Sequence, residues 1–184
     1  TVMFGEISEA TITLFKETNF NKFDSAVISR IFTNIINLFS DFSNSDSETL
    51  DDSFYICFFN SLVKILQCES FEKQNFAINC LEKMLINHNN LFFQWAMSVN
   101  PFITLNNIEG IDQIITEISR LIQKISEYRI IKIDQETLEK FITRIDNADL
   151  SQKKTFMNNF GIVASKSDEQ IVLKVIEKYI GSHK

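Results

Sequence analysis

Apolar residues recur along almost the whole chain at intervals of three and four residues, which is the spacing of one face of an α-helix. The pattern is most regular between about residues 108 and 128, where five isoleucines follow in steps of four and three: Ile111, Ile115, Ile118, Ile122 and Ile125. It predicts about nine helices in total. They span approximately residues 2–18, 24–42, 50–68, 70–86, 91–99, 108–128, 134–145, 149–163 and 167–181.

Several helix ends are predicted from side chains that can satisfy the free backbone groups of a first or last turn. The expected N-caps are Asp24, Ser70 and Asp134, with either Asp149 or Ser151 opening the eighth helix. Ser167 and Gln170 have the spacing of a capping box at the start of the last helix. Gly181 is expected to end that helix in a left-handed conformation.

The second predicted helix has an unusually wide apolar arc. A helix on the surface of a domain normally shows one apolar stripe, with polar residues opposite. Here the apolar residues cover more than one stripe, so this helix is expected to have neighbours on two sides. They are Val27, Ile28, Ile31, Phe32, Ile35, Ile36, Leu38, Phe39 and Phe42.

A polar, acidic stretch over residues 43–49 separates the second and third predicted helices. Such clusters usually mark solvated loops, and a flexible linker is the favoured interpretation. Ser43 and Ser45 each have an acidic residue three positions later, a pattern that acidophilic kinases prefer. They are therefore candidate phosphorylation sites, at which added charge would alter the following helix or dock on a basic partner.

Composition supports an all-α fold organised as a single domain over residues 1–184. Sandwiches and barrels need a turn signal about every 8–12 residues, and one proline with four glycines cannot supply them. Isoleucine, phenylalanine, asparagine and lysine are all abundant, as the codons of an AT-rich genome favour. Isoleucine alone is therefore not taken as a sign of strands.

Charge and cysteine content limit the environment and the partners. The net charge of −6 argues against nucleic-acid binding, which needs a basic surface. No apolar run has the ~18 residues of a membrane span, and the three widely spaced cysteines suit a reducing cytoplasm or nucleus. Thr1 precedes the first methionine, Met3, so the chain is expected to be a fragment of a larger protein.

The residues that carry catalysis or bind metals are scarce. The two histidines, His88 and His183, lie in a predicted loop and in the C-terminal tail. Cys80 is the thiol nearest to His88, but it falls on the predicted core face, so a Cys–His nucleophile is not expected. The glycines form no phosphate-binding loop. The sequence predicts no enzyme activity, no metal site and no cofactor.

Taken in pairs, the predicted helices begin near residues 2, 50, 91 and 134. This spacing of roughly 40 to 48 residues overlaps the period of armadillo and HEAT repeats, and in this respect the chain resembles the armadillo/HEAT family. The resemblance implies an α-solenoid of antiparallel helix pairs, wound into a right-handed superhelix whose concave surface binds partner proteins. A compact helical bundle is the alternative.

The best candidate for a partner-binding segment is the short helix at residues 91–97, which is apolar almost all round. Burial is the expectation for large apolar residues, whereas an exposed groove would take a helix of a partner. Phe92, Phe93 and Trp95 are the residues to test. The sequence thus predicts a non-catalytic interaction or scaffold module for another protein. The alternative is a compact bundle that regulates an enzyme or GTPase in trans, or self-associates through the helix of Ile111 and Ile125. The oligomeric state is left open.

Overall fold

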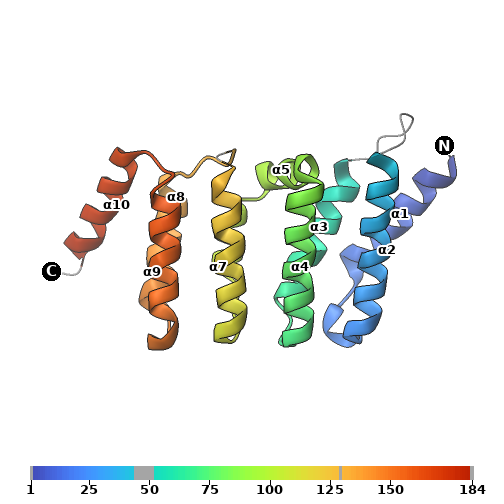
Figure 1. Ribbon diagram of the computed structural model, residues 1–184, viewed down its shortest axis with the longest axis horizontal. Helices are drawn as coiled ribbons and strands as arrows, with labels where there is room; N and C mark the ends of the chain where they lie inside the picture. The colour runs from blue at the N-terminus through green and yellow to red at the C-terminus, as the bar shows by residue number, and fades with distance from the viewer. Residues whose placement is uncertain (1, 44–51, 129, 183–184) are drawn as a thin grey trace. The chain divides into compact units, whose positions relative to one another are not determined.

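The computed structural model shows an all-α protein (Figure 1) and confirms the predicted fold class. The backbone is described for residues 2–43, 52–128 and 130–182, and the side chains for residues 9–39, 53–128 and 130–181. Within these ranges there are ten α-helices, one 3-10 helix and no strand. Their bounds are α1 Val2–Glu17, η1 Phe20–Lys22, α2 Ser25–Ser43, α3 Asp52–Leu66, α4 Phe71–Asn87, α5 Asn89–Ser98, α6 Pro101–Asn106, α7 Asp112–Glu127, α8 Gln135–Asn147, α9 Leu150–Ala164 and α10 Glu169–Ser182.

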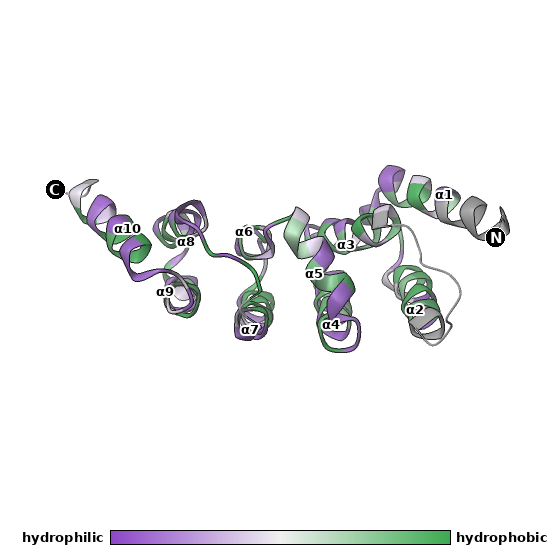
Figure 2. Ribbon diagram, turned by 90° about the horizontal axis from the view of Figure 1, so that it is seen from above, coloured by the Kyte–Doolittle hydropathy of each residue, from purple (hydrophilic) through white to green (hydrophobic). Residues whose placement is uncertain are grey.

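The helices form two compact units, residues 1–95 and residues 96–184, with the boundary inside α5. The hydrophobic pattern, which suggests a single domain, contains no signal for this division. In the first unit α1 packs on α3, α2 packs on α4, and α3 and α4 pack on each other. In Figure 2, α1 and α3 lie in one row and α2 and α4 in a second. The first unit is therefore a two-layered arrangement of helices.

Aromatic rings fill the core between these layers. Phe32 on α2 is completely buried and contacts four other rings. The ring centroids lie 5.1 Å away for Phe15, 5.9 Å for Phe20, 5.3 Å for Phe58 and 6.3 Å for Phe76. Because these rings come from α1, η1, α3 and α4, one side chain of α2 joins every other layer element of this unit.

Two lysines hold the end of α1 and the turn that follows it. Lys64 Nζ on α3 donates to the carbonyl oxygens of Lys16 at 2.9 Å and Phe15 at 3.4 Å. Lys73 Nζ on α4, a buried side chain, donates to Phe20 O at 3.0 Å and Asn21 O at 3.2 Å. Carbonyls at the end of a helix lack intrahelical donors, so Lys64 satisfies helix-end acceptors of α1. Phe20 O accepts from Phe23 N at 3.4 Å as well as from Lys73.

In the second unit α7 packs on α9, α6 and α10 pack on α8, and α8 packs on α9. The buried faces of α7 and α8 are mostly apolar. Among their polar contacts, Ser119 on α7 donates a hydrogen bond to the buried Asn159 on α9, and Asn100 donates to the buried Thr137 on α8 at 2.8 Å. Arg144 on α8 donates to Ile108 O at 3.2 Å and lies 4.9 Å above the ring of Phe156. It thereby ties α8 to α9 and to the segment before α7.

The structure confirms most of the predicted helix starts. The carboxylate of Asp24 accepts from the backbone N–H of Ala26 at 2.7 Å, and that of Asp134 accepts from Thr137 N at 2.9 Å. Ser70 caps α4 in the same way. Asp149, not Ser151, precedes α9, although its side chain makes no capping bond.

Other boundaries differ from the predictions. The capping box at Ser167 does not form, because the carboxylate of Asp168 accepts from Gln170 N at 2.8 Å while the Ser167 hydroxyl donates to Ile133 O. Gly181 lies inside α10, which continues to Ser182. Pro101 starts the additional short helix α6, since proline fits the first helical position, where no donor is needed.

Candidate interaction surfaces

The predicted partner-binding residues are part of the core and not of an exposed groove. Phe92, Phe93 and Trp95 are all buried. The indole of Trp95 stacks on Phe59 with ring centroids 5.1 Å apart, and its N–H donates to Asn60 Oδ1 at 3.1 Å. The structure thus has these side chains buried, as expected for large apolar residues, and their binding role stays a prediction. The other side of this short helix is exposed at Gln94 and Met97.

The row of isoleucines on α7 is also buried, because it packs against another helix of the same chain. Ile115, Ile118, Ile122 and Ile125 are buried, and α9 packs along this helix. Ile111 precedes the first turn and is 58% exposed. Self-association through this helix would require the second unit to open, so the regular heptad spacing reflects packing inside the chain.

The three cysteine thiols and His88 pack against other residues in the structure. Cys57, Cys68 and Cys80 are free and buried, and burial raises the pKa of the Cys80 thiol to about 12. His88 ends α4 against the ring of Phe39, and partial burial lowers the pKa of its imidazole. Low thiolate content makes such cysteines unreactive, so these three thiols are poor nucleophiles.

No described group of three or more histidine, cysteine or carboxylate side chains is arranged to hold a metal ion. Nor is any helix within the described ranges long and apolar enough to cross a bilayer. The candidate phosphorylation sites Ser43 and Ser45, the linker at 43–49 and His183 have side chains outside the described residues.

A half-enclosed cavity of about 260 Å³ lies in the second unit, beside the link from α9 to α10. Phe102, Ile125 and Ile133 form its apolar part, and Lys166 supplies its charge. The hydroxyl of Ser126 donates to Gln123 O, and the Ser167 hydroxyl is likewise bonded to the backbone. The polar wall is therefore engaged in holding helix ends together.

A row of exposed apolar side chains on the surface of the first unit lies on α2. Val27, Ile31 and Leu38 are 45%, 37% and 48% exposed, and we call them the α2 stripe. Each stands one position before a buried residue of the same helix: Ile28, Phe32 and Phe39. Since one residue turns a helix by about 100°, the α2 stripe is a second apolar face beside the buried one. Figure 2 shows α2 largely in the green of apolar residues.

The polar residues of α2 lie opposite the α2 stripe, at its border and at one position within it. Thr33 is exposed on the opposite side of the helix, and Asn34 interrupts the α2 stripe between Ile31 and Leu38. Arg30 is the only charged residue among the described side chains of this helix, and it borders the α2 stripe. A surface helix that combines exposed aliphatic side chains with a single charge is typical of an interaction site.

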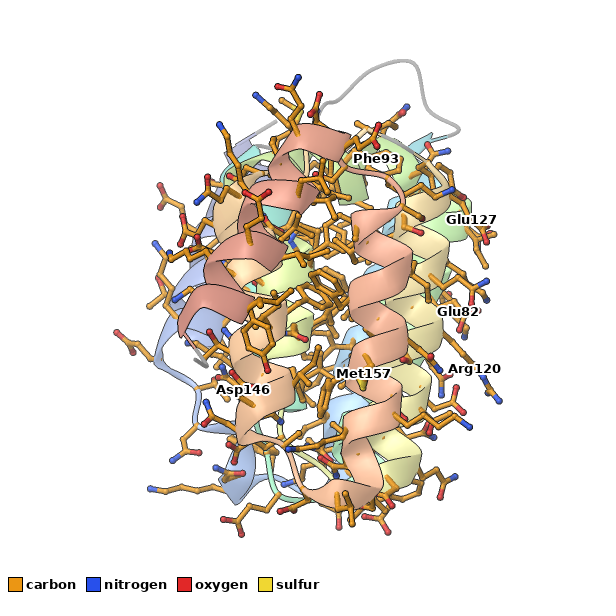
Figure 3. The ribbon with its side chains drawn as sticks, turned by 90° about the vertical axis from the view of Figure 1, so that its left-hand side faces the viewer. Glu82, Phe93, Arg120, Glu127, Asp146 and Met157 are labelled. Atoms are coloured by element: carbon orange, nitrogen blue, oxygen red, sulfur yellow. The ribbon has the colours of Figure 1, made fainter. Side chains whose placement is uncertain are left out.

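A second apolar stripe lies on α10. Leu173, Ile176 and Ile180 follow one another by three and four residues and are 51%, 36% and 53% exposed; we call them the α10 stripe. Figure 3 looks onto α9 and α10, with Met157 labelled on α9. Met157 is exposed as well.

The opposite face of α10 holds this helix on α8. Val175 is its only fully buried side chain among the described residues. Lys178 Nζ lies 2.8 Å from Glu139, and the Tyr179 hydroxyl donates to Asp146 at 2.6 Å. Hydrogen bonds from Gln135 and Lys178 lower the pKa of Glu139, and the bond to Asp146 raises the pKa of Tyr179. These contacts fix which face of α10 points outward.

Comparison with family models, with curated proteins and with solved structures finds no match to this chain. The candidate surfaces therefore depend on their own geometry. The sequence contained a signal for the α2 stripe, because the wide apolar arc of this helix predicted neighbours on two sides. It contained a weaker signal for the α10 stripe, whose aliphatic residues merge with those of the buried face.

Proposed function

We propose that this chain is a non-catalytic protein-interaction module of the helical-repeat type, which binds through the outward faces of α2 and α10. The observation that carries the proposal is the α2 stripe, a row of exposed aliphatic side chains directly beside a fully formed core. Such a face gains free energy from leaving water, at roughly 25 cal/mol for each Å² of apolar surface buried. A protein partner supplies the complementary apolar surface.

The pattern of helix contacts supports the repeat architecture. In the first unit α1 packs on α3 and α2 on α4; in the second α6 packs on α8, α7 on α9 and α8 on α10. In each of these five pairs, a helix contacts the second helix after it, as successive helix pairs do when they stack. Stacked pairs present one helix after another on a surface, and this is how armadillo-like proteins bind their partners. The exposed stripes lie on helices at the outer positions of their units.

Site-specific photo-crosslinking tests the proposal. A benzophenone amino acid replaces Ile31 in the α2 stripe or, as the matched control, Thr33 on the opposite side of the same helix, and the full chain is irradiated in its native cell. We expect a protein adduct from position 31 and none from position 33. Mass spectrometry identifies the adduct as a copy of this chain or as another protein. Equal labelling from both positions, or none from position 31, would refute an interaction face on α2.

A further inference from the structure

We propose that the α2 stripe of one copy of this chain binds the α10 stripe of a second copy. This inference rests on the proposed function, since it names the partner of the same faces. Both stripes are aliphatic, both follow helical spacings of three, four or seven, and both lie on outer helices. Paired side by side, they would cover each other as neighbouring helices of a solenoid do.

Charge selects this pairing over the alternatives. Arg30 borders the α2 stripe, and no acidic residue lies among the described side chains of α2. On α10, Glu169 lies in line with the α10 stripe and Glu177 borders it, whereas Lys174 and Lys178 lie on other sides of the helix. An α2–α10 contact brings Arg30 toward these carboxylates. Complementary charges of this kind set the choice of partner and its register.

A contact between two identical faces would bring like charges together. Two α2 stripes related by a two-fold axis would bring Arg30 of one copy toward Arg30 of the other, and two α10 stripes would bring their glutamates together. Like charges at an interface disfavour the pairing. The α2–α10 contact is heterologous, so each copy keeps one unused stripe and can bind a further copy.

The size of the two stripes sets the expected strength of the contact. Three exposed side chains on each face make a small contact, and small interfaces bind weakly. Association is therefore expected at high protein concentration.

Sedimentation equilibrium of the full chain tests this inference, with concentrations up to about 1 mM so that a millimolar dissociation constant is detected. The average mass of the unchanged chain is expected to rise above the monomer value of 21.4 kDa with concentration. Ile31→Glu blocks only the α2 stripe and Ile176→Glu only the α10 stripe, so each variant alone is expected to stay at the monomer mass. Thr33→Glu and Lys174→Glu place a carboxylate on exposed positions of the same helices away from the stripes and should associate normally.

An equimolar mixture of the two stripe variants separates the proposed contact from all others. The Ile31→Glu copy retains its α10 stripe and the Ile176→Glu copy retains its α2 stripe, so the mixture should form a dimer of twice 21.4 kDa and grow no further. Leu38→Glu and Leu173→Glu replace the two variants if circular dichroism shows that either is unfolded. A mixture that stays monomeric, or a single variant that still associates, overturns the inference.

Failure of this inference is distinguishable from failure of the proposed function. If the unchanged chain stays monomeric throughout while position 31 crosslinks a different protein in the cell, the second-copy contact is overturned and the interaction module stands. If the chain stays monomeric and position 31 yields no adduct, both are refuted.

Discussion

Replacing Phe92 by alanine tests directly whether the aromatic segment of α5 is core or binding surface. The ring is 1% exposed, and its centroid lies 5.7 Å from Phe59 and 5.4 Å from Trp95. Truncating a buried phenylalanine to alanine costs about 3–5 kcal/mol, because transfer free energy is lost and a cavity remains. Since a domain is stable by only about 5–15 kcal/mol, the variant should lose a large part of the stability of the first unit.

Urea unfolding followed by fluorescence measures this loss. Trp95 is the only tryptophan of the chain and lies in the first unit, so its emission reports on the unit that contains the substitution. The urea midpoint should fall strongly, and the thermal midpoint should fall by more than about 10 °C for a unit of this size. Gln94→Ala, an exposed neighbour on the same helix, is the matched control and should change stability by no more than about 0.5 kcal/mol.

The opposite result would refute the structural reasoning. If Phe92→Ala kept the midpoint of the unchanged chain and selectively lost a protein partner, the ring would have to be exposed in solution. The segment would then be the binding groove that its sequence also permits, and the packing of Phe92 against Phe59 would not describe the molecule in solution.

Three further outcomes follow from the structure. Asp134→Ala should lower the free energy of unfolding by about 1 kcal/mol at neutral pH, because the α8 cap is lost. Hydrogen bonds from Thr137 hold the pKa of Asp134 in the folded state below its ordinary 3.8, so the ionised carboxylate stabilises the fold above pH 3.8. The difference in unfolding free energy between the unchanged chain and the variant should therefore disappear as the pH falls through the lowered folded pKa. Urea unfolding at a series of pH values measures this difference. At about pH 8 the native chain should react with a thiol reagent only slowly and release all three thiols after denaturation; rapid labelling of the folded chain would contradict their burial. Val175→Asp should remove the hydrogen-exchange protection of residues 169–182 and leave α7 protected, whereas unchanged protection would show that the polar contacts hold α10 without Val175.

Features set by a few adjacent residues were predictable from the sequence. Asp24, Ser70 and Asp134 cap their helices as expected because an N-cap depends on one side chain and the next two or three N–H groups. The same holds for the core face of α7, where a regular isoleucine spacing leaves one possible orientation. Residues that are close in sequence decide both features, so tertiary packing had little to override.

Features that depend on competition between neighbours were not predictable. Ser167 and Asp168 both have capping side chains, and the Ser167 hydroxyl is used by Ile133 O, a backbone atom far away in sequence. Gly181 remains helical although it is suited to end a helix. The division into two units likewise follows from which helices pack together, and a pattern of helical periods contains no information on that choice.

The surfaces on α2 and α10 show what a hydrophobic pattern can and cannot establish. The double apolar arc of α2 predicted neighbours on two sides, whereas in the structure one of its two apolar faces is exposed. It could not indicate what covers this face, since aliphatic side chains accept any apolar surface of suitable shape. That information lies in the charges around the stripe: Arg30 on α2 and Glu177 on α10 have opposite signs at the borders of matching faces. Charge at the rim supplies the selectivity that the aliphatic centre lacks, and for this reason the mixture of stripe variants, more than any stability measurement, decides which partner α2 was built for.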